Sequence, residues 1–146
     1  MIFLTREIYN GMQEGSGWER KARNQFRRRA AHYRRYLEVI APLLPPAMRR
    51  LCRNSPHDAV IRSASQNSHA LVLEVDATKA FSGYRGRKLR LVFSGVKRRI
   101  PCKRLRGQWW LYEEAHLSIR SQFSLHVMFD KSDVEIEADE LVIEHP

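Results

Sequence analysis

Residues 123–139 read FSLHVMFDKSDVEIEAD, and this stretch decides the fold. Hydrophobic side chains occupy every second position of residues 123–129, and they do so again in residues 134–138. An alternation of period two places one face of a strand against a core and the other toward solvent, which is typical of antiparallel sheets. Lys131-Ser132-Asp133 supplies a turn between the two runs. The stretch therefore predicts an antiparallel hairpin.

The same alternation extends outward from this hairpin. Residues 71–76 and 88–93 repeat it, and turn signals lie at residues 65–67, 82–86 and 107–108. After Ala138 the alternation changes parity, because Leu141 and Ile143 are odd-numbered, which predicts a bulge or turn at Asp139-Glu140. Five to seven short strands are expected over residues 57–146. They indicate an antiparallel β-sandwich-like or open-barrel unit.

Residues 1–56 have a helical period instead. An apolar stripe recurs at spacings of three and four, at Trp18, Ala22, Phe26, Ala30, Tyr33, Leu37 and Ile40. It predicts a long helix from about residue 16 to Ala41, where Pro42 ends or kinks it. Shorter helices are expected on either side, one capped by Thr5 and one from Pro45 to about Arg53.

Together these patterns predict an α+β protein. Two or three N-terminal helices, within residues 1–56, should pack on the antiparallel β unit of residues 57–146. The helical stripe is too apolar to stand alone, so we expect one cooperative domain. A chain of 146 residues with 43% hydrophobic content can bury a sizeable core.

The composition also bounds the location and the chemistry. No apolar run approaches the length of a membrane span, and the first residues do not form a signal peptide, so we expect a cytoplasmic protein without a membrane partner. Cys52 and Cys102 are isolated and cannot build a zinc site, and a cytosolic disulfide is not expected. We expect no cofactor.

Charge is distributed in blocks, and the formal net charge is +10. Residues 20–53 carry eleven Lys or Arg against the single acid Glu38, and residues 79–106 carry eleven against none. Residues 107–146 carry nine acids against Arg120 and Lys131. A strongly basic chain favours anionic partners.

Twelve residues are therefore candidates for binding an anion or a partner. They are Arg27, Arg28, Arg29, Arg34, Arg35, Lys97, Arg98, Arg99, Lys103, Arg104, Trp110 and Tyr112. Each has a structural alternative. The alternative for the arginine helix is a solvated face whose apolar stripe packs on the β unit, and the acidic strand of Glu135, Glu137 and Asp139 neutralises a basic strand if the two lie side by side. The alternative for Trp110 and Tyr112 is packing in the core.

We expect a non-catalytic binding module that recognises an acidic macromolecule, with a protein as the first choice, in a bacterial immunity or accessory role. The alternative is binding of RNA or single-stranded DNA by the arginine helix and the basic strands, where aromatic rings stack on bases. No catalytic or metal motif is present. A third class, a hydrolase, requires a pocket that brings His57, His116 or His126 next to a carboxylate.

The chain also resembles an uncharacterised bacterial family, a domain of unknown function. The resemblance is carried by the opening residues 1–12, Leu43-Leu44-Pro45, His57-Asp58-Ala59, Phe93-Ser94-Gly95-Val96, Trp110-Leu111-Tyr112-Glu113-Glu114 and the ending from Phe123 to Asp130 with an acidic strand after it. It covers nearly the whole chain and implies a cytoplasmic protein with no established activity and no catalytic residues to carry over. The high arginine content departs from the family pattern.

Overall fold

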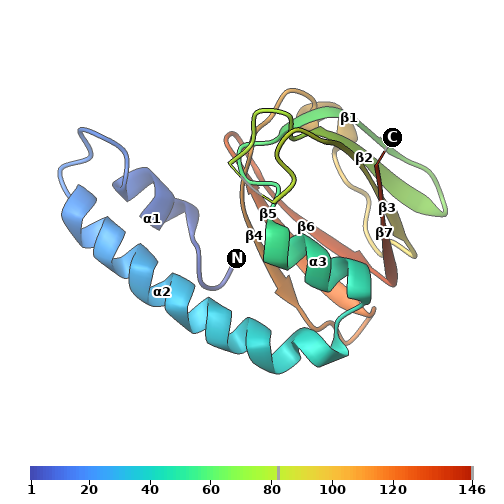
Figure 1. The fold of residues 1–146 in the computed structure, drawn as a ribbon, viewed down its shortest axis with the longest axis horizontal. Coiled ribbons are helices and arrows are strands. Elements are labelled where there is room, and N and C mark those ends of the chain that lie inside the picture. Colours follow the sequence, from blue (N-terminus) through green and yellow to red (C-terminus); the bar gives the residue numbers. More distant parts are fainter. Residues whose placement is uncertain (82, 146) are drawn as a thin grey trace.

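The computed structural model describes residues 1–81 and 83–145, and its helices precede its sheets (Figure 1). The helices are α1 (Arg6–Gly11), α2 (Glu19–Ile40) and α3 (Pro46–Asn54), and the short α4 (Cys102–Leu105) lies within the β unit. Thr5 caps α1 as predicted, with its hydroxyl accepting from the backbone N–H of Ile8. The single-turn helix α4 was not predicted.

The predicted long helix is confirmed, with a later start. Gly17 has a φ of +82°, which an α-helix does not tolerate, so α2 begins only at Glu19. At its other end α2 stops at Ile40, and a single 3₁₀ turn, η1 (Ala41–Leu43), contains Pro42. Pro42 has no backbone N–H to continue the helical hydrogen bonds, so α2 ends close to the position that the sequence indicated.

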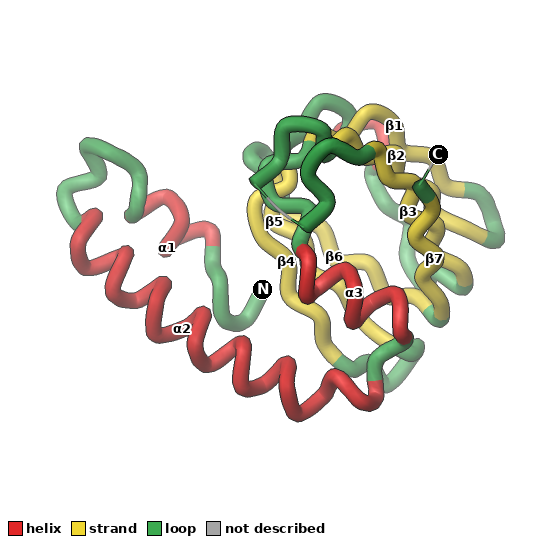
Figure 2. The backbone as a smooth tube through the Cα atoms, in the orientation of Figure 1, coloured by secondary structure: helices red, strands yellow, loops and turns green. Residues whose placement is uncertain are grey.

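The strands form two antiparallel sheets, and neither closes into a barrel. One sheet has the order β1 (Val60–Gln66), β2 (Ala70–Asp76), β3 (Lys88–Ser94) and β7 (Glu140–Glu144). The other has the order β4 (Trp110–His116), β5 (Phe123–Phe129) and β6 (Asp133–Ala138). Figure 2 shows the two sheets facing each other, with α1 and α2 on one side of the β unit. This architecture confirms the α+β fold class.

The two sheets are joined along both sides. On one side, Trp110 N–H donates to the carbonyl of Ala59 over 2.8 Å, at the start of β1 and β4. On the other side, the chain leaves β6 at Asp139 and enters β7 in the opposite sheet, while Asp139 N–H donates to Ser94. The predicted irregularity at Asp139-Glu140 is thus the point where the chain changes sheets.

The core lies between the sheets. The alternating residues of the predicted strands are buried there, with Phe93, Phe123 and Phe129 among the largest. Helix α3 packs against both sheets through β4 and β7, and its Met48 and Leu51 are fully buried. Figure 1 shows α3 between the sheets, whereas α1 and the first half of α2 lie outside the sheet of β4, β5 and β6.

Strand β4 departs from simple alternation. Its register with β5 shifts between Trp110 and Tyr112, so that Trp110 and Leu111 are both buried. An extra residue in one strand changes the side to which the next side chains point. A plain alternation, which predicts Trp109 and Leu111 on one face and Trp110 and Tyr112 on the other, is therefore wrong for β4.

Helix α2 reaches the β unit through its apolar stripe. The hydroxyl of Tyr33 accepts from the backbone N–H of Ala115 in β4 over 2.8 Å, and the rings of Phe26 and Tyr112 are 5.2 Å apart. The stripe therefore positions the opposite, arginine-rich face of α2 toward solvent.

Candidate functional site

The arginines of α2 form an exposed basic face. Arg27, Arg28, Arg29, Arg34 and Arg35 are all exposed. Arg29 donates to the carbonyl of Ile2 over 3.2 Å, but no α2 arginine forms an ion pair with any residue among 1–81 and 83–145. The positive charge of this face is thus available to a partner.

A basic groove lies where α2 meets α3. Two adjoining hollows of about 340 and 650 Å³ share Glu38, Ala41, Arg49 and Arg53. Arginines border the groove, and its apolar surface comes from Leu37, Ala41, Pro42, Pro46 and Cys52. Of the predicted residues only Arg34 belongs to it. Arg49, Arg50 and Arg53 were counted in the basic block but were not singled out, although their place on a helix after two prolines was visible.

The second basic block is partly neutralised within the protein. Lys97 lies 2.7 Å from Asp139, and Arg98 lies 3.3 Å from both Glu135 and Glu137. The acidic strand does not pair with a basic strand, since β6 pairs only with β5, and the basic residues come from the loop after β3. The positive charges of Lys97 and Arg98 are therefore compensated by carboxylates of the protein itself. Arg99, Lys103 and Arg104 are exposed.

The two aromatic candidates do not form a surface patch. Trp110 is fully buried, and its indole N–H donates to Glu113 Oε2 over 2.7 Å. Tyr112 is half-buried and packs against the rings of Tyr9, Phe26 and His57. The core alternative holds for Trp110, which removes it from the candidates for partner contact. Trp109 is 49% exposed instead.

Behind Trp110, Glu113 is a buried carboxylate that the sequence analysis did not single out. The hydroxyl of Ser55 and the indole of Trp110 both donate to its Oε2. Burial raises the pKa of Glu113 to about 7, despite these two hydrogen bonds and the nearby His57. His57 itself hydrogen-bonds the carbonyl of Leu111 in β4. It is therefore separate from the other two candidate histidines, His116 and His126.

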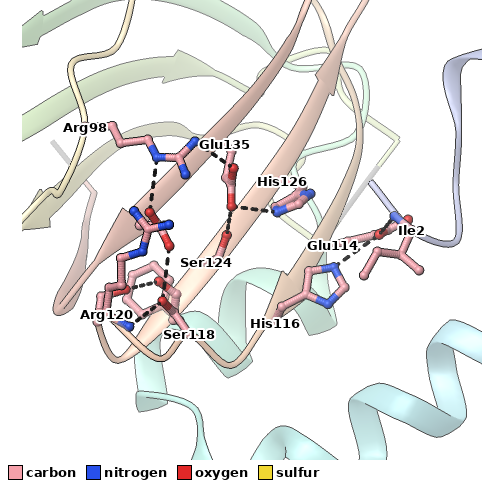
Figure 3. A network of polar contacts seen from close by, with 12 residues as sticks. Ile2, Arg98, Glu114, His116, Ser118, Arg120, Ser124, His126 and Glu135 are labelled. Atoms are coloured by element: carbon pink, nitrogen blue, oxygen red, sulfur yellow. Dashed lines mark hydrogen bonds and ion pairs between the residues drawn. The ribbon is translucent and has the colours of Figure 1, made fainter.

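The outward face of β4, β5 and β6 carries a polar network in two rows (Figure 3). The strand register places Glu114, His126 and Glu135 in one row. It places His116, Ser124 and Glu137 in the next. Ser124 and His126 occupy the outward positions of the alternation in residues 123–129, but no local pattern in the sequence indicates that they meet Glu114 and His116.

At the β4 end of this network, Glu114 holds the N-terminal segment. Its buried carboxylate accepts backbone N–H groups from Ile2, Phe3 and Leu4 over 2.5–2.9 Å. It also lies 3.2 Å from His116 Nε2. Burial raises the pKa of Glu114, but these hydrogen bonds outweigh it and hold the pKa below its ordinary value.

At the β6 end, Glu135 is the centre of the network. It lies 3.1 Å from His126 Nε2, accepts from Ser124 over 2.9 Å and pairs with Arg98. Burial raises the pKa of Glu135, but Ser124, His126 and Arg98 together lower it below its ordinary value. Burial also lowers the pKa of His126, which favours the neutral imidazole.

A hollow of about 370 Å³ lies beside this network, and both His116 and His126 line it next to carboxylates. The hydrolase hypothesis required such a pocket, but the serine hydroxyls here donate to carboxylates, Ser124 to Glu135 and Ser118 to Glu137, and the hydroxyl beside His116 is that of Tyr36. This is not the arrangement of an activated serine. Within the described part of the chain, no three His, Cys, Asp or Glu residues are placed to hold a metal ion.

An N-terminal helical hairpin and α3, packed on two facing antiparallel sheets, define an α+β protein with an exposed basic face on α2. The family model described as "Protein of unknown function (DUF4085)" matches residues 3–138, and the chain belongs to this family. No curated protein and no solved structure matches the chain. Among the described helices, none combines the length and the apolar character needed to cross a membrane.

Proposed function

We propose that the protein is a non-catalytic binding module that recognises an acidic protein partner through the groove between α2 and α3. The observation that carries this proposal is the combination of an apolar floor with arginines that form no ion pair with any described residue. Arg34, Arg49 and Arg53 border the groove, and Leu37, Ala41 and Cys52 line it. Such a module suits an accessory role.

Protein is favoured over nucleic acid by the apolar share of the groove. Carboxylates on a partner pair with the arginines, and apolar side chains of the same segment cover Leu37 and Ala41. A single-strand platform needs rings exposed among cations. Trp110 and Tyr84 are buried and Trp109 is exposed, but Lys97 and Arg98 are already paired, so the β3–β4 region supports that alternative less than its sequence indicated.

The proposal is tested with two fluorescently labelled probes, an amphipathic peptide of alternating Glu and Leu pairs and an oligouridine of similar charge. Binding is followed by anisotropy at several salt concentrations. We expect the peptide to bind more tightly and with a shallower dependence on salt, because apolar burial is not screened. Tighter oligouridine binding with a steep linear slope of log affinity against log salt would instead support the nucleic-acid alternative.

A matched pair of variants locates the site. Arg49→Ala with Arg53→Ala removes two charges from the groove, and Arg85→Ala with Arg87→Ala removes two exposed charges from the loop before β3. We expect the groove variant to weaken peptide binding on the order of tenfold and the loop variant to change it less than about twofold. Equal losses in both would mean that only the net charge attracts the peptide, and the groove would not be the site.

A further inference from the structure

The outward face of β4, β5 and β6 is only partly covered by the helices. At the β4 end, Glu114 binds the N-terminal segment and His116 lies against Tyr36 of α2. At the β6 end, Glu135 and Glu137 border the hollow of about 370 Å³ (Figure 3). This second half of the face is built of partly buried polar groups and is contacted by side chains from loops, Ser118 at Glu137 and Arg98 at Glu135 and Glu137.

Glu137 has a buried oxygen that lacks a hydrogen bond. The residue is only 6% exposed, and its Oε1 accepts from the hydroxyl of Ser118 over 3.2 Å. Arg98 Nε lies 3.3 Å from Oε2, but the two are not aligned as a hydrogen bond, and no other described group donates to that oxygen. A buried acceptor without a donor is destabilising, and native proteins rarely leave one unexplained.

Exposed apolar side chains surround the same hollow. Ile2, Leu117 and Ile119 line it and are 62%, 42% and 102% exposed. Large apolar side chains gathered beside a depression are typical of a surface that another molecule covers. A ligand for this place therefore has apolar surface as well as a hydrogen-bond donor.

The local charges favour a ligand without net charge. Glu135 and Glu137 both pair with Arg98, and a second guanidinium group, that of Arg120, also lines the hollow. An added cation is repelled by the arginines and an added anion by the carboxylates, so neither sign is favoured. A peptide group satisfies the remaining needs, because it donates through N–H and accepts through C=O.

Glu114 shows in this same molecule how a buried carboxylate on this sheet holds a peptide, by accepting the N–H groups of residues 2–4. We propose that the hollow beside β6 binds an uncharged, apolar segment of a partner protein, with a backbone N–H of that segment donating to Glu137 Oε2. The side chain of the segment packs on Ile2, Leu117 and Ile119. This site is separate from the basic groove, since Tyr36 and Leu37 of α2 line different hollows.

The probe is N-acetyl-leucine-N-methylamide, which carries one apolar side chain, two N–H donors and no charge. It is titrated into the ¹⁵N-labelled full chain, and amide chemical shifts are followed. We expect saturable shifts at residues 117–120 and 137, with a dissociation constant in the millimolar range for so small a ligand. Leucine-N-methylamide and N-acetyl-leucine, which carry a positive and a negative charge, are expected to bind at least about fivefold more weakly.

Two variants give the proposal a way to fail. Glu137→Gln is expected to weaken binding about fivefold, because a neutral acceptor is poorer than a carboxylate. Ile119→Ser changes a fully exposed side chain, so it leaves folding intact and is expected to weaken binding by about threefold. Glu144→Gln on β7 is the control and should have no effect. No saturable shifts, tighter binding of a charged probe, or equal affinity in Glu137→Gln and Glu144→Gln would overturn the proposal.

Binding of the leucine probe should not depend on the basic groove between α2 and α3. The variant with Arg49→Ala and Arg53→Ala is expected to bind the leucine probe unchanged while losing the acidic peptide. Loss of both probes in that variant would contradict the assignment of two separate sites.

Discussion

Two neighbouring glutamates of β4 have pKa values shifted in opposite directions. Glu113 points into the core, where burial raises its pKa to about 7. Glu114 points to the other face, where backbone N–H groups and His116 overcome the effect of burial and lower its pKa. At the scale of the residue, the donors that each carboxylate meets decide its charge.

Glu113 makes stability depend on pH near neutrality. Its folded pKa of about 7 lies above the ordinary value of 4.5, so the protonated carboxyl stabilises the fold fully below pH 4.5. This contribution is lost as the pH rises to 7 and beyond, by about 3 kcal/mol. Glu113→Gln keeps an acceptor for Ser55 and Trp110 but does not ionise. We expect its free energy of unfolding, measured with urea from pH 4.5 to 8, to fall less steeply than that of the wild type.

At Glu114 the dependence of stability on pH has the opposite sign. Its folded pKa is lowered, so the carboxylate stabilises the fold above pH 4.5, and this contribution is lost as the pH falls. Glu114→Gln removes the charge that accepts three N–H groups, and we expect about 2–4 kcal/mol of destabilisation at pH 7. Hydrogen exchange at residues 2–4 should accelerate more than exchange in β2. Unchanged protection of residues 2–4 would contradict this anchoring role.

At the scale of the element, the change of sheets at Asp139 depends on close contact with Gly95. Gly95 follows β3 with a φ of +66°, and a Cβ there would collide with the Asp139 carboxylate that pairs with Lys97. Glycine is required for both reasons, the backbone conformation and the space.

Gly95→Ala is therefore expected to destabilise the protein by about 2–3 kcal/mol, as judged by chemical denaturation. Gly86→Ala is the matched control, because Gly86 has a φ of +80° but open space around its Cα. Gly86→Ala should lower the free energy of unfolding only by the backbone strain, about 1 kcal/mol. Equal losses in the two variants would show that the contact with Asp139 is unimportant.

At the scale of the whole molecule, the helices and sheets share contacts that should make them unfold together. Tyr33 of α2 binds the backbone of β4, and Leu51 of α3 is buried in the core between the sheets. We expect a single cooperative transition, with far-ultraviolet circular dichroism and tryptophan fluorescence giving the same midpoint in urea. A separate, earlier loss of helical signal would mean that α1 and α2 form an independent unit.

The sequence predicted most of the helices and strands but not the contacts between them. Period and proline positions located α2, α3 and most strands, because local backbone sterics and one-sided burial act within a few residues. The prediction for β4 failed because a register shift at Trp110 follows from pairing with β5, which no local pattern shows. The basic block was visible, yet only the fold separates the exposed Arg34 from the paired Arg98.

By itself the sequence determined the class of fold, the strongly basic surface of α2 and the irregularity at Asp139. The tertiary structure alone decided which charges remain free, that Trp110 is core, and that Glu114, His116, His126 and Glu137 share one face. Ion pairs and hydrogen bonds join residues as many as 127 positions apart, as between Arg6 and Asp133. Their geometry is set by strand order and sheet packing, which depend on the whole chain at once.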